Sequence, residues 1–198
     1  MARTQGFDRD TVVRAARTLF WTTSYESASI PELEAATGLS RSSIYNAFGS
    51  KRGLFDAAVE NYLDEVVRPR LQPLKADVVA PEAILDYLRG LHGAFLTLSS
   101  MPASNGCLLI NAAGAPIARD PQVSRVIADY RTELHDAIAR GVRAQPDSRG
   151  AAEQSRLADT VTNLVVAAFA LARIDSAEAA RSIETAVGIV TVAADVVG

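Results

Sequence analysis

Residues 29–48 read SIPELEAATGLSRSSIYNAF and contain two short helix-forming segments separated by a turn at Gly38. The first segment opens with Ser29-Ile30-Pro31-Glu32, which has the S-x-x-E spacing of a capping box with proline in the first turn. Gly38 allows the left-handed backbone that a tight corner between two helices requires. Ser40 can cap a second helix, which Gly49 ends. This stretch therefore predicts a helix–turn–helix.

The second predicted helix, residues 40–48, separates its side chains by face. At about 100° per residue, apolar side chains fall on one side and polar side chains on the other. The apolar set is Ile44, Ala47 and Phe48; the polar set is Ser42, Tyr45 and Asn46, with Arg41 on its flank. The apolar set can pack against a preceding helix at 8–23, while the polar set faces outward and contains no acidic residue.

The polar face has the chemistry that the major groove of DNA requires. Arginine binds guanine O6 and N7, asparagine pairs with adenine, and serine donates or accepts. Tyr45, Lys51 and the backbone N–H groups behind Ser29 suit phosphate oxygens, and short serine side chains allow a close approach to the bases. We expect the DNA-binding residues to be Ser29, Ser40, Arg41, Ser42, Ser43, Tyr45, Asn46 and Lys51.

The rest of the chain shows helical patterns and no strand with clean alternation. One helix follows Ser50 and is expected to end at Pro69 and Pro73. Breaker residues separate five further predicted helices, at 81–99, about 106–117, 121–145, 151–174 and 176–196. We expect an all-α protein of about nine helices, with a helix–turn–helix DNA-binding domain at 1–50 and a helical ligand-sensing and dimerisation domain at 51–198.

Composition and charge limit the class of protein. Of 198 residues, 48% are hydrophobic and 22% are charged, which is typical of a globular chain. The net charge is −3, yet residues 1–52 hold seven Arg or Lys against five Asp or Glu, so only the N-terminal part is basic. One cysteine excludes an intrachain disulfide framework, and two histidines beside it argue against a zinc finger. We expect no metal and no cofactor.

The sequence also lacks targeting signals. The N-terminus, MARTQGFDRD, is polar and does not lead into an apolar segment, so no signal peptide is predicted. Serine, proline and glycine interrupt the longest segment without Asp, Glu, Lys or Arg, residues 90–118, and a membrane-spanning helix needs roughly 20 apolar residues in a row. We expect a soluble, cytoplasmic protein with no membrane partner.

Residues 12–55 resemble the DNA-binding domain of TetR-type transcriptional regulators. The resemblance is carried by Val12-Val13-x-Ala15-Ala16-x-x-Leu19-Phe20, Tyr25, Ser29-Ile30-x-x-Leu33, Gly38-Leu39-Ser40, Ile44-Tyr45-x-x-Phe48, Ser50-Lys51 and Leu54-Phe55. It implies a homodimer, most often a repressor, that binds a palindromic operator in double-stranded DNA and is released by a small-molecule inducer or a covalent signal. The size of the reading helix also favours a homodimer, because one short helix contacts only a few base pairs and specific binding needs two half-sites.

The chain departs from the pattern of that family at several positions. Ser24 stands where glycine is usual, and Ala28 where threonine is frequent. Glu34 and Thr37 replace two common alanines, and Arg41-Ser42-Ser43 is a less usual opening of the recognition helix. Glu34 weakens DNA affinity if it points toward phosphate, and needs a partner if it points inward.

The last two predicted helices carry apolar stripes. In the family, these helices resemble the pair that builds a four-helix dimer bundle. We expect the dimer interface to include Leu157, Val161, Leu164, Val165, Ala168, Ile183, Val187 and Val190. The alternative is that both stripes face the core of the chain itself.

The sensor of an unknown inducer is sought between residues 54 and 170. Cys107 opens a predicted helix, where the helix N-terminus favours a thiolate, and Gly-Cys-Leu-Leu there resembles a subgroup of TetR-type repressors, some of which sense electrophiles or oxidants through cysteine. The alternative is a buried structural cysteine. Candidate sensor residues are Cys107, Tyr62, Tyr87, Phe95, Asn111, Tyr130, Asn163 and Phe169.

Two other classes of protein remain as alternatives. An enzyme would need Cys107 beside His92 or His135 as a nucleophile–base pair, but the sequence has no Gly-rich phosphate loop, metal cluster or nucleophile elbow. A helical protein-interaction module would keep the helix–turn–helix without binding DNA. Altering Tyr45 or Lys51 separates these alternatives, because only a DNA-binding protein loses salt-dependent affinity.

Overall fold

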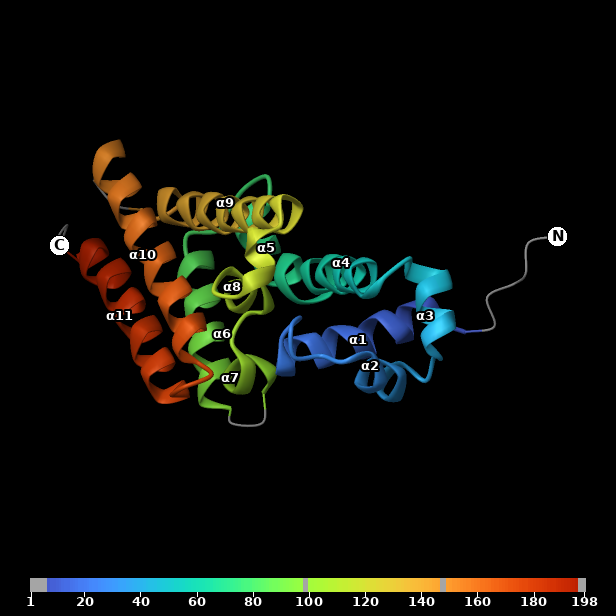
Figure 1. Ribbon diagram of the computed structural model, residues 1–198. Helices are drawn as coiled ribbons and strands as arrows, with labels where there is room; N and C mark the ends of the chain where they lie inside the picture. The colour runs from blue at the N-terminus through green and yellow to red at the C-terminus, as the bar shows by residue number, and fades with distance from the viewer. Residues whose placement is uncertain (1–6, 98–99, 147–148, 196–198) are drawn as a thin grey trace.

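The computed structural model describes residues 7–97, 100–146 and 149–195, with side chains described as far as Thr191. These residues form helices and contain no strand, which confirms the all-α prediction. Figure 1 shows an elongated molecule, with a small helical cluster near the N-terminus at one end and a larger helical body at the other. The predicted helix ends at 99 and 196 lie outside the described residues.

The N-terminal cluster consists of α1 (Arg9–Thr23), α2 (Ile30–Thr37) and α3 (Arg41–Phe48). The predicted serine caps set the starts of α2 and α3, because Ser29 and Ser40 each accept a backbone N–H three residues later. This local chemistry explains why the predicted and observed bounds of the three helices nearly coincide.

Aromatic packing holds the cluster together and ties it to the next helix. Leu33 and Ile44 are fully buried, and the ring of Phe20 meets the ring of Phe55 edge to face at 5.2 Å. Such ring pairs contribute roughly 0.5–1.5 kcal/mol beyond the area that they bury. The apolar side of α3 is thus fixed on the interior, as its pattern predicts.

One long rod connects the cluster to the body. It consists of α4 (Lys51–Tyr62), the π-helical segment η1 (Leu63–Val67) and α5 (Arg68–Lys75), which follow without a break. The predicted end at Pro69 and Pro73 is therefore wrong. Both prolines are exposed, so water can bond the carbonyl groups that lose an N–H partner, and the helix continues past them.

The body is built from four longer helices. In it α6 (Ala83–Leu96) packs on α11 (Ser176–Asp195), α11 packs on α10 (Ala151–Leu171), and α10 packs on α9 (Pro121–Arg143). Figure 1 places α10 and α11 side by side at the end of the molecule opposite α3. Each of these helices begins and ends within three residues of the range that its pattern predicts.

The predicted helix at about 106–117 is wrong in detail, because it starts after Gly106 and is interrupted at Gly114 and Ala115. The chain forms α7 (Met101–Asn105), α8 (Leu108–Ala113) and a 3₁₀ segment, η2 (Pro116–Arg119). Gly106 has φ +63° and ψ −132°, and a Cβ there would overlap the carbonyl oxygen of Phe169. Counting the long rod as one helix, the nine predicted helices correspond to α1, α2, α3, the rod, α6, α8, α9, α10 and α11, and the described residues add the short α7 and η2.

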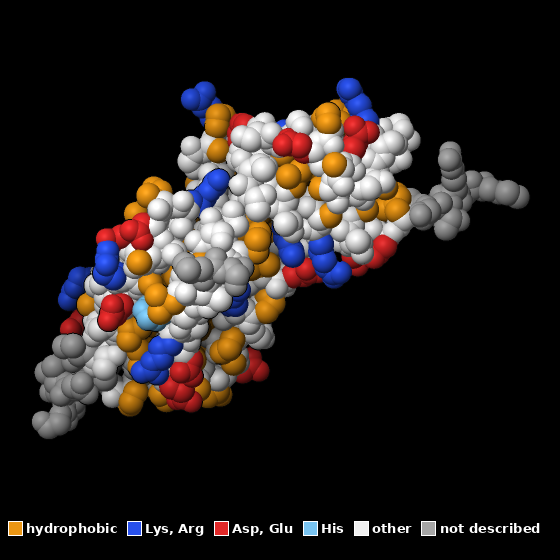
Figure 2. All heavy atoms as spheres, turned by 90° about the horizontal axis from the view of Figure 1, so that it is seen from below, with side chains coloured by type: hydrophobic (Ala, Val, Ile, Leu, Met, Phe, Trp, Pro, Cys, Tyr) orange, Lys and Arg blue, Asp and Glu red, His pale blue; other side chains and the backbone are white. Residues whose placement is uncertain are grey.

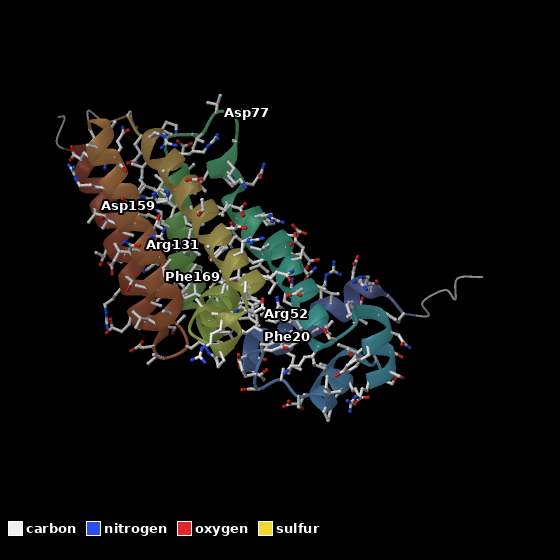
Figure 3. The ribbon with its side chains drawn as sticks, turned by 45° about the horizontal axis from the view of Figure 1, so that its top comes forward. Phe20, Arg52, Asp77, Arg131, Asp159 and Phe169 are labelled. Carbon is white, nitrogen blue, oxygen red and sulfur yellow. The ribbon has the colours of Figure 1, made fainter. Side chains whose placement is uncertain are left out.

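Side-chain contacts join the cluster to the body. The predicted boundary after residue 50 falls at the start of α4, which packs against α1. Arg52 of α4 forms a 2.6 Å ion pair with Asp120, and the indole N–H of Trp21 donates to the carbonyl oxygen of Gly106 at 3.1 Å. Figure 3 labels Arg52 at this junction. The C-terminal end of α1 and the start of α4 are thus both bonded to the region around α8 and α9.

Candidate nucleic-acid interface and sensor region

The outward face of α3 carries the polar side chains that the sequence predicts. Arg41, Ser42 and Asn46 are exposed, and Tyr45 is 39% exposed, whereas Ile44 on the opposite face is fully buried. A shallow hollow runs along the start of this face and is lined by Glu34, Ser40, Arg41, Ser42 and Tyr45. These four side chains are therefore accessible from outside the chain.

Arg41 lies against its own helix. Its guanidinium carbon is 5.5 Å from the centre of the Tyr45 ring, one turn along α3. A cation over an aromatic ring gains roughly 0.5–1 kcal/mol at an exposed site. Among the described residues Arg41 has no carboxylate partner, so its charge stays available on the exposed face.

The three serines of the recognition helix differ in their roles. The Ser40 hydroxyl accepts the backbone N–H of Ser43 at 3.3 Å and lies 3.0 Å from the hydroxyls of Ser42 and Ser43. Ser43 is half-buried, while Ser42 is exposed. Ser40 and Ser43 therefore mainly stabilise the start of α3, and Ser42 is the serine that is best placed to meet a base.

The start of α2 has the capping box that the sequence predicts. The backbone N–H and the hydroxyl of Ser29 donate to Oε2 of Glu32 at 2.8 and 2.7 Å, which completes the capping box. Hydrogen bonds from Ser29 lower the pKa of the Glu32 carboxyl, so a negative charge occupies this helix end. The backbone N–H groups of Ser29 and Glu32 are thus already bonded within the capping box, which leaves fewer donors at this helix end for a phosphate.

Lys51 is held at the start of α4. Its ammonium lies 4.6 Å from the centre of the Tyr25 ring and is half-buried. Burial lowers the pKa of Lys51, while the nearby carboxylates of Glu26 and Glu32 act in the opposite direction and raise it. The ring fixes the direction of the lysine, which keeps a cation beside α3.

Most other cations of the cluster are already paired. Arg14 and Arg17 of α1 bind Glu65 in η1 at 2.7 and 2.9 Å, and Arg52 binds Asp56 and Asp120. On the face in Figure 2, Lys and Arg side chains are interspersed with Asp and Glu over both parts of the molecule. The positive charge that remains for DNA is thus local to the surroundings of α3.

Arg9 is a further cation near α3 that sequence reasoning missed. Its guanidinium carbon lies 4.4 Å from the centre of the Phe48 ring, and its Nη1 donates to the carbonyl oxygen of Ala47 at 3.3 Å. The contact joins residues 38 positions apart, so no local pattern reports it. Arg3, which adds to the basic count of the sequence, lies outside the described residues.

Cys107 is buried inside a group of tyrosines. It caps the start of α8, as predicted, but its side chain is fully buried and its thiol donates to the Tyr130 hydroxyl at 3.5 Å. Burial, followed by the effect of the Cys107 thiol, raises the pKa of the hydroxyls of Tyr62 and Tyr130. The structure brings together three of the predicted sensor residues in the interior.

The remaining predicted sensor residues lie elsewhere. Phe95 and Phe169 pack edge to face at 5.6 Å in the core, and Asn111 donates to the carbonyl oxygen of Asn105 at 2.7 Å. Asn163 is exposed on α10, where its Oδ1 accepts from Arg131 at 3.2 Å. The expectation that Asn163 lines an internal cavity is therefore wrong, because its face of the helix points to solvent.

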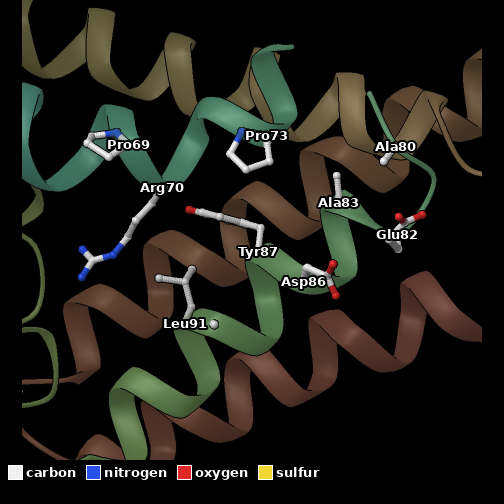
Figure 4. A pocket seen from close by; sticks show the side chains of 10 residues that line it. Pro69, Arg70, Pro73, Ala80, Glu82, Ala83, Asp86, Tyr87 and Leu91 are labelled. Atoms are coloured by element: carbon white, nitrogen blue, oxygen red, sulfur yellow. The ribbon is translucent and has the colours of Figure 1, made fainter. Parts of the chain in front are cut away.

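A pocket of about 400 Å³ opens between α5 and α6. In Figure 4 the Tyr87 ring lies beneath Pro73 with its hydroxyl directed toward the Arg70 side, while Asp86 and Glu82 lie at the opposite end. Burial raises the pKa of Tyr87. Of the predicted sensor residues, only Tyr87 lines this pocket. In the sequence, the pair Pro69 and Pro73 marks the segment that forms one wall of the pocket.

Comparison with known proteins identifies the family. Residues 12–58 match the pattern described as bacterial regulatory proteins, tetR family. The chain is 30% identical over 148 residues to YezE, an uncharacterized HTH-type transcriptional regulator of Bacillus subtilis (strain 168), and the match covers 74% of each protein. The chain belongs to the TetR family. It is thus a DNA-binding transcriptional regulator and not an enzyme.

Two further relatives extend the comparison. ComR, an HTH-type transcriptional repressor of Escherichia coli (strain K12), is 34% identical over 110 residues, which are 55% of this chain and 51% of ComR. CifR, a TetR family transcriptional regulator solved as a cysteine-substituted variant with 26-bp double-strand operator DNA, is 29% identical with a TM-score of 0.75. That match covers 94% of this chain and 98% of CifR, so it includes both the cluster and the body.

The expected dimer stripe of this TetR-family chain needs correction. Five of its residues are fully buried within the single chain and have no surface to offer a partner: Val161, Val165, Ala168, Ile183 and Val190. They are covered because α11 packs against both α10 and α6. Leu157, Leu164 and Val187 are half-buried and keep part of their surface exposed.

The groups required by the enzyme alternative are not assembled. The Cys107 thiol contacts Tyr130, while His135 lies 3.1 Å from Asp159 and 3.4 Å from Asp136. In the part of the chain that the structure describes, no three His, Cys, Asp or Glu side chains are grouped to bind a metal ion. None of the described helices has both the length and the apolar content to cross a membrane.

Proposed function

We propose that this TetR-family regulator is a repressor that binds a palindromic operator as a homodimer and leaves it in response to a small molecule or a thiol-reactive signal. The observation that carries the proposal is the exposed face of α3, where Arg41, Ser42 and Asn46 are accessible to a duplex. Their donors and acceptors match base edges in the major groove. The relative ComR is named as a repressor, which supports the direction of regulation.

The need for two half-sites supports the dimer. An eight-residue helix such as α3 contacts only a few base pairs, so useful specificity requires two symmetric copies about one helical turn of DNA apart. The outer surface of α10 and α11 suits such a contact, because Ala167, Ala170 and Gly188 are exposed there and allow helices to approach closely. Partly exposed Leu164 and Val187 add apolar area.

The release step is supported by the links between the body and the cluster. Trp21 of α1 is bonded to Gly106, the neighbour of Cys107, and the Trp21 ring meets the ring of Tyr62 of α4 at 4.9 Å. A ligand in the α5–α6 pocket or an adduct on Cys107 would push on these contacts. Because α1 and α4 carry α3, movement there changes the distance between the two reading helices of a dimer.

Selection of bound sequences from random duplex DNA by the purified full chain tests the proposal. We expect enrichment of one palindromic consensus with two equivalent half-sites. A protein-interaction module would enrich no sequence, and a consensus without symmetry would contradict the homodimer. A Lys51→Met variant is expected to lose affinity for all duplexes to a similar degree, because Lys51 is assigned to phosphate and not to a base.

A further inference from the structure

Glu34 is an acidic side chain on the surface that reads DNA. It lies in the second half of α2, is half-buried, and lines the hollow at the start of α3 together with Arg41, Ser42 and Tyr45. Its Oε1 accepts the backbone N–H of Arg41 at 2.6 Å. The carboxylate is therefore held at a fixed place beside the first turn of the recognition helix.

The charge of Glu34 is not neutralised by a neighbour. No described Arg or Lys forms an ion pair with it, and the guanidinium of Arg41 lies over the Tyr45 ring instead. Among the described residues its second carboxylate oxygen has no hydrogen-bond donor. A negatively charged acceptor thus remains open on the face that approaches DNA.

The bonding at the start of α3 weakens its usual attraction for phosphate. Two of its backbone N–H groups are already occupied, that of Arg41 by Glu34 and that of Ser43 by Ser40. A phosphate placed there would meet a carboxylate and not a free helix end. The favourable partner for the open oxygen is a hydrogen-bond donor on a base.

We propose that Glu34 is a specificity-determining residue that selects cytosine or adenine, and disfavours guanine and thymine, on the DNA strand that faces the first turn of α3. In the major groove only cytosine N4 and adenine N6 carry such a donor, whereas guanine O6, guanine N7 and thymine O4 are acceptors that a carboxylate disfavours. The inference rests on the proposed operator binding. It adds that one base position of each half-site carries an amino group on the strand that faces Glu34.

The test compares Glu34→Gln with wild type on a set of duplexes in which each half-site position is changed in turn. Glutamine keeps an acceptor for the Arg41 N–H but loses the charge and gains a donor. At one position, replacing a preferred cytosine by guanine or thymine is expected to cost wild type about tenfold in affinity and Glu34→Gln about threefold or less. If the preferred base is adenine, glutamine can itself pair with it, and Glu34→Ala is then the variant that must lose the preference. Preferences at the other positions stay unchanged.

Glu32→Gln is the matched control. It removes the same charge from the same helix. Glu32 belongs to the capping box of Ser29 and lies outside the hollow at α3. Glutamine can take the place of glutamate in a capping box, so the helix start is kept. We expect Glu32→Gln to keep the base preference of wild type. Glu34→Ala is the second variant, with alanine as the residue common at this position in the family, and it is expected to lose the same preference as Glu34→Gln.

Three results would overturn the inference. Unchanged preference in Glu34→Gln and Glu34→Ala would reduce Glu34 to a helix cap. An equal gain in affinity for every duplex in both variants would show that Glu34 only repels phosphate. Failure of wild type to select any duplex would overturn operator binding itself, and is distinguished because no position-dependent preference is then seen in any variant.

Discussion

Arg41 is the side chain on α3 whose chemistry is most specific for a base. Its guanidinium is exposed, is supported by the Tyr45 ring, and has no carboxylate partner among the described residues. Arg41→Ala is therefore expected to weaken operator binding by about 1–3 kcal/mol without unfolding the protein, because a bidentate contact to guanine is lost. Gel-shift titration measures this, with Arg125→Ala as a control that removes an exposed arginine from α9. Equal affinity in Arg41→Ala and wild type would remove Arg41 from the reading set.

Ser24 explains one departure from the family pattern. It has φ +94° and ψ +166°, a backbone conformation that glycine adopts readily and other residues adopt at a cost of about 1–3 kcal/mol. Ser24→Gly is expected to stabilise the protein by about 1 kcal/mol, after the extra entropy of glycine in the unfolded chain is subtracted. Urea unfolding measures the change. Ser24→Ala keeps the strain and loses the hydroxyl that accepts the Ser27 N–H, so a gain in stability there would contradict this explanation.

At the scale of residues, local chemistry was predictable and long-range contacts were not. The caps at Ser29 and Ser40 and the exposed face of α3 follow from spacing alone. The partner of Glu34 and the ring contact of Arg9 depend on how separate helices pack, which no single segment encodes. The burial of Cys107 is also a long-range effect, because the tyrosines that cover it come from α4 and α9.

At the scale of elements, Glu65 fastens α1 to the π-helical segment of the long rod. Arg14 Nη2 and Arg17 Nη1 bind its carboxylate, and Arg17 also donates to Asn61 at 2.8 Å. Hydrogen bonding from Arg14 lowers the pKa of Glu65 to about 2, from an ordinary value of 4.5. The pairs join the cluster to the point where the rod changes its hydrogen-bond pattern, and such π segments are frequent at functional sites.

This pairing gives Glu65 a defined pH dependence. Because the pKa is lower in the folded chain, the stabilisation is complete above about pH 4.5 and is lost as the pH falls toward 2. Wild type is therefore expected to be more stable than Glu65→Gln at pH 7, and the difference between the two should vanish near pH 2. Urea unfolding at several pH values measures the difference. A gap that persists at pH 2 would show that the charge of Glu65 is not its source.

The positions of the helices could be predicted from the sequence, but the places where helices are interrupted or continue could be predicted only in part. Periodicity and caps give the starts and ends of α1, α3 and α9. The continuation of the rod past Pro69 depends on exposure to water, and the break at Gly106 depends on the approach of the Phe169 carbonyl. Both causes are tertiary, so the local pattern does not report them.

At the scale of the whole molecule, the proposed homodimer places the outer faces of α10 and α11 at the interface between two chains. Light scattering is expected to give twice the chain mass of 21.0 kDa. Ala167→Glu places a charge on an exposed position of α10, so it should leave the single chain folded and shift the population toward monomer. Thr132→Glu on α9 is the control. A dimer that persists unchanged in Ala167→Glu would place the interface elsewhere.

The body was less predictable than the cluster because its helices are apolar on more than one face. Sequence periodicity identified stripes on α10 and α11 but could not say which stripe faces the core, and most of the chosen residues are buried within one chain. The cluster has only one apolar side per helix, so its inward and outward faces could be assigned. This contrast explains why the exposed face of α3 could be assigned from the sequence and the pocket beside Arg70 could not.

The central claim is that the exposed face of α3 lies against DNA in the complex. A Ser42→Cys variant in a Cys107→Ser background carries one thiol, on that face, and Thr132→Cys in the same background carries one thiol on α9. With the selected duplex at saturation, alkylation of the cysteine at position 42 is expected to slow at least tenfold while alkylation at position 132 keeps its rate. Equal rates at position 42 with and without bound duplex would contradict the claim.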